Sequence, residues 1–265
     1  MKINTSKVKG VLHQSKSAQN YRLRRYFPDA LLAGFVEQFW FVDWQLPEDR
    51  PHIQKNLPDL NFHLLFNEGK LSILGPVSKA YSYKMVNSGS IVGVKFELGA
   101  LTPLLNSKPA DYIDRQLRIE DVFGGDIPEL IEGLVSANND QELVQALQRY
   151  LMPFTSTPLP SMLRARELVN TIKNDIYIAK VDALSSRAGL SVRAIQRCLK
   201  EHLGVSPKWL IRKYRLHRAL EMLDDEGADI ADVVTWLDYT DQSHLIRDFN
   251  EIIGITPKSY IDGKS

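Results

Sequence analysis

"SVRAIQRCLKEHLGVSPK" (residues 191–208) is followed, fifty residues further along the chain, by "DQSHLIRDFNEIIGITPK" (residues 241–258). Both stretches begin with polar residues, continue through an apolar middle and end in Gly-x-Ser/Thr-Pro-Lys. The hydroxyl of Ser or Thr caps a helix and Pro suits its first position, so this ending predicts a turn and a new helix. We expect both copies to adopt the same local structure.

A helical hairpin is predicted for the first copy together with the residues before it. Residues 181–188 have the pattern of a short helix, and Gly189 can adopt the positive φ that such a turn often needs. In the helix capped by Ser191, we expect apolar side chains on one side: Ala194, Ile195, Cys198 and Leu199. On the other side we expect polar side chains: Arg193, Gln196, Arg197 and Lys200.

This polar face has the hydrogen-bonding groups that read DNA. Arg can donate two hydrogen bonds to guanine, Gln can pair with adenine, and Lys neutralises phosphate. Two helices joined by a tight turn, the second with such a face, are typical of a helix-turn-helix, whose second helix enters the major groove. One such motif is a weak signal. Two in the same register favour a chain that reads two successive segments of the groove.

The second copy predicts another helix-turn-helix, with helices at about residues 230–237 and 241–253. We expect its apolar side to be formed by Leu245, Ile246 and Phe249. Its polar side would carry Gln242, Ser243, His244 and Arg247. Asp238 stands in the turn, and Asp tolerates left-handed backbone better than most residues, so we expect the turn to form with some strain.

Residues 160–262 resemble the DNA-binding domain of AraC/XylS-type bacterial transcription regulators. The resemblance lies in "AGLSVRAIQRCLKEHLGVSP", "RLHRALEML" and "YTDQSHLIRDFNEIIGITPKSY". It implies that six side chains face bases: Arg193, Gln196 and Arg197, then Gln242, His244 and Arg247. The remaining DNA-binding candidates are Ser191, Lys200, Lys208, Ser243 and Lys258. Through "LPDLNFHLLFN", "LGP" and "VGVKFELGALTPLL", the N-terminal part is similar to an uncharacterised regulatory domain attached to such regulators.

Charge is unevenly distributed along the chain. The formal net charge is +1, yet residues 160–218 carry 13 Lys and Arg against 4 Asp and Glu. Residues 219–265 carry 3 basic against 11 acidic side chains. A strongly basic segment is the electrostatic footprint expected for a polyanionic partner. Because the second copy lies in the acidic segment, we predict that the first motif supplies most of the affinity for DNA.

The chain as a whole predicts an α+β protein of two domains. Residues 1–154 would form a β-rich regulatory, effector-binding or dimerisation domain with trailing helices. Its strands are expected in "FVEQFWFVDW" (35–44), "LNFHLLF" (60–66), "LSILG" (71–75), "YSYKM" (81–85) and "IVGVKFE" (91–97). The proline-rich "MPFTSTPLP" (152–160) is typical of a linker. Residues 155–265 would form an all-α double helix-turn-helix domain of about seven helices, with Trp209 and Trp236 in its core.

Several classes of protein do not fit the sequence. Cys198 is the single cysteine of the 265 residues, so an intrachain disulfide is excluded. The N-terminus is polar and no apolar run reaches about 18 residues, so we expect neither a secretory signal nor a transmembrane helix, and a cytoplasmic setting. The six histidines lack metal-ligand spacing, and phosphate-loop and dinucleotide fingerprints are missing. We therefore expect no enzyme, no cofactor and no metal.

Two alternatives remain open at this point. One is a DNA repair or modifying enzyme that uses the same DNA-docking domain, with Cys198 as a reactive thiol. The other is a protein-interaction module whose helical repeat packs on a partner. For the preferred interpretation, a sequence-specific transcription regulator, the expected partner is double-stranded promoter DNA. Further candidate partners are RNA polymerase, a small-molecule effector and a second copy of the chain, and no membrane is expected.

Overall fold

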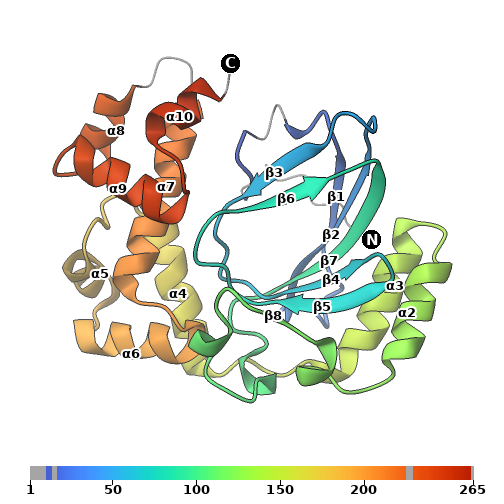
Figure 1. Cartoon of the computed structure of the whole chain (residues 1–265). Helices are drawn as coiled ribbons and strands as arrows, with labels where there is room; N and C mark the ends of the chain where they lie inside the picture. The colour runs from blue at the N-terminus through green and yellow to red at the C-terminus, as the bar shows by residue number, and fades with distance from the viewer. Residues whose placement is uncertain (1–9, 14–16, 225–228, 264–265) are drawn as a thin grey trace. The chain divides into compact units, whose positions relative to one another are not determined.

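The computed structural model of the chain describes residues 10–13, 17–224 and 229–263. Over these residues the first part of the chain is β-rich and the last part is helical, as Figure 1 shows. This order confirms the predicted α+β fold. Within the described part, no helix combines the length and the apolar character that crossing a bilayer requires.

Two compact units divide the chain. The first contains residues 1–77 and 82–158, and the second contains residues 159–265 together with residues 78–81. The first helix of the second unit, α4, begins at Pro160. Proline suits the first position of a helix because its missing N–H would have no partner there in any case.

A six-stranded antiparallel sheet forms the frame of the first unit, in the order β1-β2-β7-β4-β5-β8, while β3 and β6 pair separately. The strands are β1 (Arg22–Tyr26), β2 (Val36–Gln45), β3 (His52–Asn56), β4 (His63–Asn67), β5 (Lys70–Leu74), β6 (Tyr81–Met85), β7 (Ser88–Phe96) and β8 (Gln116–Leu117). Five of them overlap predicted segments. The sequence did not predict β1, β3 or β8.

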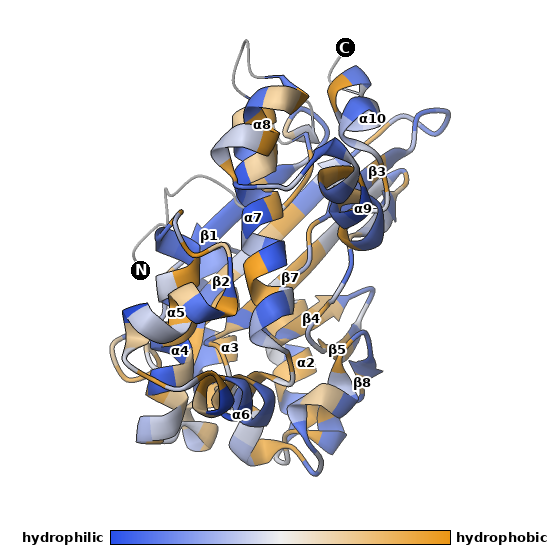
Figure 2. Ribbon diagram, turned by 90° about the vertical axis from the view of Figure 1, so that its left-hand side faces the viewer, coloured by the Kyte–Doolittle hydropathy of each residue, from blue (hydrophilic) through white to orange (hydrophobic). Residues whose placement is uncertain are grey.

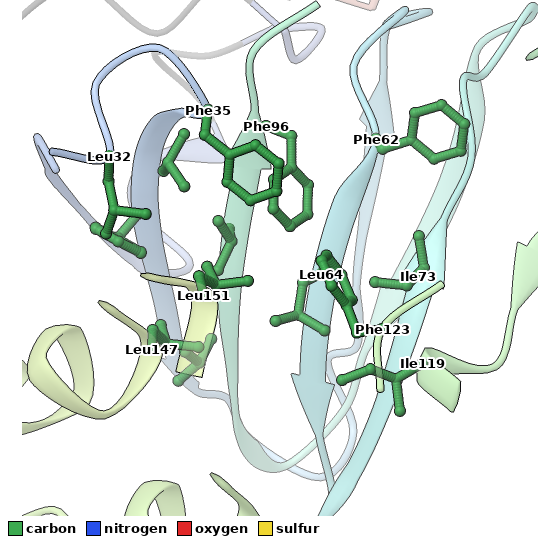
Figure 3. Packing of buried hydrophobic residues seen from close by; sticks show 14 of the residues in the cluster. Leu32, Phe35, Phe62, Leu64, Ile73, Phe96, Ile119, Phe123, Leu147 and Leu151 are labelled. Atoms are coloured by element: carbon green, nitrogen blue, oxygen red, sulfur yellow. The ribbon is translucent and has the colours of Figure 1, made fainter. Parts of the chain in front are cut away.

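The core of the first unit lies between one face of this sheet and two helices, α2 (Ile127–Ser136) and α3 (Asp140–Leu151). Leu64, Ile73 and Phe96 point from the sheet, and Leu147 and Leu151 point from α3 (Figure 3). Each of these five side chains is at most 1% exposed. Because alternate residues of a strand face opposite sides, Phe39 and Phe41 of β2 join this core, while Val42 and Trp44 pack with Met85 in a smaller second cluster.

Seven α-helices form the described part of the second unit, the number predicted. They are α4 (Pro160–Asn174), α5 (Val181–Ala188), α6 (Val192–Leu203), α7 (Pro207–Asp224), α8 (Ile230–Trp236), α9 (Gln242–Ile252) and α10 (Pro257–Asp262). Their starts follow the capping residues of the sequence. Ser191, Asp241 and Thr256 each accept a hydrogen bond from a backbone N–H in the first turn of the helix that follows.

The long helix α7 joins the two halves of this unit. It packs against α4, α5 and α6 on one side and against α8 and α9 on the other. Hydrophobic and hydrophilic residues alternate along it (Figure 2), and Leu210, Leu216 and Leu220 are buried. An apolar side chain every third or fourth residue gives a helix faces that can pack on neighbours. The helices before and after α7 therefore share one central support.

Candidate nucleic-acid interface

The first helix-turn-helix is formed by α5 and α6. Gly189 follows α5 with φ of 64°, a left-handed conformation that costs glycine little. The N–H of Leu190 then donates to the carbonyl oxygen of Ser185 at 3.2 Å, which closes the turn. Ser191 starts α6, because its hydroxyl accepts from the N–H of Ala194 at 3.2 Å. The tight turn expected from the sequence is present.

Helix α6 separates its apolar and polar residues as predicted. Ile195 and Leu199 are 0% exposed and fix the helix to its neighbours, while Ala194 and Cys198 are half-buried at the edge of that seam. The outer face consists of four exposed side chains: Arg193, Gln196, Arg197 and Lys200. Because the buried residues hold the helix in place, these four side chains can contact a partner without disrupting the core.

The second helix-turn-helix is formed by α8 and α9. Asp238 has φ of 54°, so the predicted left-handed turn at this aspartate is confirmed. The N–H of Tyr239 donates to the carbonyl oxygen of Val234 at 3.0 Å, as Leu190 does in the first motif. The Asp241 side chain caps α9 by accepting from the N–H of His244 at 2.8 Å. The turn is longer than the first, spanning residues 237–241 instead of 189–191.

Arg215 of α7 supports this second turn, a role that the sequence did not reveal. Its Nη2 donates to the carbonyl oxygens of Leu237 and Asp238 at 2.8 and 2.9 Å. Its guanidinium lies 3.9 Å from the centroid of the Tyr239 ring. Arg215 is only 7% exposed, so these contacts stabilise a buried positive charge. The turn that contains the left-handed Asp238 is therefore stabilised by hydrogen bonds from Arg215 to two of its carbonyl oxygens.

Arg212, also on α7, holds α9, the second helix of the same hairpin. It forms an ion pair with Asp248 of α9 at 2.8 Å and a second one with Glu251. Burial disfavours its charged form, but the hydrogen bonds from Arg212 to Glu251 and Asp248 outweigh that effect and raise the pKa of the guanidinium. The Asp248 carboxylate is 1% exposed, so it faces the interior and not a partner.

Only some of the cations in the basic segment, residues 160–218, are available to an anionic partner. Arg218 donates to the carbonyl oxygens of Ile172 and Lys173, at 2.8 and 3.0 Å, near the end of α4. Burial lowers the pKa of this guanidinium. Four of the 13 cations lie in α7 and are buried or half-buried: Arg212, Lys213, Arg215 and Arg218. Tertiary contacts use three of them, Arg212, Arg215 and Arg218, so these side chains are not available to an anionic partner.

Helix α9 exposes a different set of residues. Leu245 and Phe249 are 0% exposed, as predicted, but Ile246 is 37% exposed and lies outside the apolar seam. Residues that differ by one position are rotated by about 100° around a helix, so Ile246 projects in a different direction from the buried Leu245. Among the predicted polar residues, His244 is half-buried and three are exposed: Gln242, Ser243 and Arg247.

The two tryptophans predicted for the helical core differ in burial. Trp209 is half-buried, whereas Trp236 is 71% exposed, so the prediction for Trp236 is wrong. Val233 is the buried residue of α8, and Leu237 and Tyr239, which follow the helix, are both less than 9% exposed. These two side chains occupy the core beyond the end of α8, which leaves Trp236 at the surface.

Two lysines stand at equivalent places after the two recognition helices. Lys208 follows the buried Pro207 at the start of α7, and Lys258 follows the buried Pro257 at the start of α10. Both lysines are exposed. A cation in this place can neutralise a phosphate without reading a base.

Cys198 does not have the surroundings of an activated thiol. Its side chain is half-buried, and its Sγ lies 3.6 Å from the carbonyl oxygen of Ser161. Burial, followed by the charge of Glu201, raises the pKa of the thiol. A nucleophilic cysteine needs a stabilised thiolate, and this environment favours the protonated form. Within the residues that the structure describes, no three His, Cys, Asp or Glu side chains are grouped to hold a metal ion.

The first unit contains a polar cluster of its own. The ammonium of Lys95 lies 3.0 Å from the Asp59 carboxylate and 3.2 Å from that of Glu37. Burial disfavours the charged Lys95, but Asp59 and Glu37 outweigh it and raise its pKa. His63 lies between Asp59, at 3.4 Å, and the indole N–H of Trp40, at 3.3 Å. The cluster forms because β7 pairs with β2, which carries Glu37 and Trp40, and with β4, which carries His63.

Comparison with known families gives two matches. A family model described as a helix-turn-helix domain matches residues 184–263. A second family, described as a domain of unknown function, matches residues 24–118. The helix-turn-helix match confirms the expected resemblance of the C-terminal part to AraC-type regulators, and the second match places an uncharacterised domain before it.

Two of the similar proteins are named as transcriptional activators, and a third is known from its crystal structure. The HTH-type transcriptional activator RhaS of Escherichia coli O139:H28 (strain E24377A / ETEC) is 26% identical over 83 residues, which cover 31% of this chain and 30% of RhaS. RhaS of Shigella boydii serotype 18 (strain CDC 3083-94 / BS512) is 25% identical over 83 residues, with the same coverage. The crystal structure of ToxT from Vibrio cholerae O395 bound to (E)-4-(8-methylnaphthalen-1-yl)but-3-enoic acid aligns with 93% of this chain and 100% of that chain, at 12% identity and a TM-score of 0.42. The matched segment thus spans less than a third of the RhaS sequences.

Proposed function

From an AraC-type helix-turn-helix domain that follows a domain of unknown function, we propose that the chain is a sequence-specific DNA-binding transcription regulator. It reads two successive major-groove segments with two helix-turn-helix motifs, and the N-terminal domain controls it. The proposed DNA-binding domain begins at residue 155. The observation that carries the proposal is the outer face of α6, where four exposed polar side chains project from a helix that the buried Ile195 and Leu199 fix from the other face.

The first motif supplies base readout and charge. Arg193 and Arg197 can each donate two hydrogen bonds to guanine, and Gln196 can pair with the edge of an adenine. Lys200 lies one turn further along the helix and neutralises phosphate, as does Lys208. Ser191 caps the helix and is exposed at the end that would enter the groove first.

The second motif uses fewer charges. Arg247 is the only Lys or Arg of α9, and it is exposed at the position equivalent to Arg197. Gln242 and Ser243 lie exposed in the first turn, with His244 beside them, and Lys258 adds a phosphate contact. We propose that this motif sets position and part of the specificity, while the first motif supplies most of the affinity.

The length of α7 suits simultaneous binding by both motifs. Its 18 residues span about 27 Å at the α-helical rise of 1.5 Å per residue. Successive faces of the major groove are separated by about 34 Å along the duplex. A helix of this length can hold two recognition helices about one duplex turn apart, so one chain can contact two neighbouring groove segments.

Control by the N-terminal domain is part of the proposal. A ligand changes the activity of a regulator only if it binds one arrangement of the domains more tightly than another. A small-molecule effector, a second copy of the chain and RNA polymerase remain predictions, as does promoter DNA as the target. Against the alternative of a DNA-modifying enzyme stands the raised pKa of the Cys198 thiol.

The test is selection of bound DNA by the full chain. Fragments of genomic DNA are equilibrated with the protein, and the retained fragments are sequenced and titrated at several salt concentrations. We expect one shared sequence to be enriched, and binding that weakens steeply with salt because Lys and Arg displace condensed counterions. Retention of no duplex, or a flat salt dependence, would overturn the proposal.

A further inference from the structure

We propose that Ile246 of α9 contacts the 5-methyl group of a thymine, so that the second motif recognises an A·T pair through an apolar contact. The inference rests on the proposed function and deepens it, because it names what the second recognition helix reads. It starts from an exposed aliphatic side chain at a place where the first motif has a polar one.

The repeat fixes where Ile246 points. Ile246 lies fifty residues after Gln196, and both side chains are exposed. The buried residues agree in the same register, since Leu245 is 0% exposed like Ile195, and Phe249 is 0% exposed like Leu199. The two helices therefore turn equivalent faces inward, and Ile246 occupies on α9 the outward position that Gln196 occupies on α6.

The surroundings of Ile246 on α9 are polar. Ser243, Arg247 and Asn250 are exposed around it, one turn before it, beside it and one turn after it. Because these three neighbours are polar, Ile246 does not form with them an apolar patch of the kind that binds another protein. A single aliphatic side chain within a polar, outward face fits a partner that offers one apolar group among many hydrogen-bonding groups.

The major groove offers such a group in thymine. Its base edges present carbonyl oxygens, ring nitrogens and amino groups, and the thymine 5-methyl is the apolar exception. Isoleucine has no donor or acceptor, so placing it against a cytosine amino group or a guanine oxygen would leave that group without its water. If α9 enters the groove, the base partner best suited to Ile246 is therefore thymine.

The side chain is also held in place. The α9 backbone is capped by Asp241, and Asp248 pairs with Arg212 at 2.8 Å. A β-branched residue in a helix has one strongly preferred χ1 rotamer, so Ile246 loses little freedom when it meets a surface. A rigid helix with a stiff aliphatic side chain can discriminate one methyl group.

The experiment uses the full chain and the duplex that it selects. Each thymine of the segment protected by the second motif is replaced singly by deoxyuridine, which lacks only the methyl group. We expect one replacement to weaken binding about fourfold, which corresponds to about 0.8 kcal/mol for one buried methyl group. In Ile246→Ala the same replacement should have no effect, and a 5-methylcytosine·guanine pair at that site should restore part of the loss that a cytosine·guanine pair causes.

Two control variants isolate the contact. Gln196→Ala, at the equivalent position of α6, should keep the full sensitivity to deoxyuridine in the second segment. Val135→Ala changes an aliphatic residue of α2 that is 67% exposed, and it should alter neither binding nor sensitivity. Binding without any methyl-sensitive thymine, or sensitivity that survives in Ile246→Ala, would overturn the inference and leave the proposed function standing. If the unmodified chain binds no duplex, both fall.

Discussion

The two helix-turn-helix motifs share an inner side and differ on the outer one. Equivalent inward positions are apolar and buried in both, as at Leu199 and Phe249. The outward positions carry three cations on α6, at Arg193, Arg197 and Lys200, and one on α9, at Arg247. Burial thus preserves the shape of the motif, while the exposed face is free to change in charge and in what it can contact.

The motifs also differ in what holds them. The first turn combines a left-handed glycine with a hydrogen bond from the Ser185 hydroxyl to the carbonyl oxygen of Leu190. The second turn places an aspartate in that conformation, and Arg215 donates hydrogen bonds to its carbonyl oxygens. Arg212 adds an ion pair with the buried Asp248 of α9. Helix α9 therefore has few cations on its exposed face, whereas two cations of α7, Arg212 and Arg215, contact the buried side of the second motif. In the second motif, more cations make internal contacts than are exposed on α9.

The largest expected effect comes from removing that support. Arg215→Ala leaves the carbonyls of Leu237 and Asp238 without their charged donor, so we expect a loss of about 3 kcal/mol in the free energy of unfolding of the helical unit. Urea denaturation of the full chain, followed by helical circular dichroism, measures it. Arg187→Ala is the matched control, because its side chain is 68% exposed and pairs only with Asp175 at 3.4 Å, which predicts a change within about 0.5 kcal/mol. Equal losses would mean that Arg215 does not support the turn.

The next effect compares the two recognition helices directly. Arg197→Ala should weaken DNA binding by about 1–3 kcal/mol, the range expected for one bidentate contact to a base. Arg247→Ala should cost less, because fewer charges accompany it on α9. Titration of both variants on the selected duplex at one salt concentration gives the comparison. A larger loss for Arg247→Ala would reverse the proposed ranking of the motifs.

The backbone strain in the two turns can be tested by substituting Gly189 and Asp238. Gly189→Ala introduces a side chain at φ of 64°, where nothing lies within 4 Å of the added carbon, so backbone strain alone should cost about 1 kcal/mol. Asp238→Gly relieves similar strain and should stabilise the helical unit by less than about 1 kcal/mol, since a more flexible unfolded chain offsets part of the gain. Thermal and urea unfolding of both variants provide the test. Destabilisation by Asp238→Gly would show that the aspartate side chain contributes more than its strain costs.

The smallest effect sharpens the charge comparison. Asn250→Lys places a cation on α9 at the position of Lys200 on α6, and both native side chains are exposed. We expect slightly tighter binding and a slope of log K against log salt that becomes steeper by about 0.9, the value for one further phosphate contact. Asn250→Gln is the neutral control. An unchanged slope would place this face of α9 away from the phosphates.

Much of the helical unit could be predicted because local signals and tertiary packing agree in it. The residues Ser191, Asp241 and Gly189 end or begin helices through their own chemistry, so the sequence located both motifs. The face of α6 followed from its periodicity. Ile246 was misplaced because periodicity allowed two adjacent apolar residues on one side, and only the packed structure decides which of them is buried.

The rest depended on contacts between distant parts of the sequence. Arg212, Arg215 and Arg218 resemble DNA-binding cations until their partners, up to 46 residues away, are known. In the first unit, β1 was missed because its sequence, RLRRY, hides the strand alternation behind arginines. Arg24 of that strand pairs with Asp140, 116 residues away, which no local pattern reveals.

A hydroxyl-radical footprint of the full chain on its selected duplex tests the central claim most directly. If one chain reads two groove segments, the footprint at protein concentrations that place one chain on each duplex will show two protected stretches whose centres lie about ten base pairs apart. Arg197→Ala should weaken protection of one stretch first, and Arg247→Ala the other. A single protected stretch, weakened equally by both variants, would contradict the account.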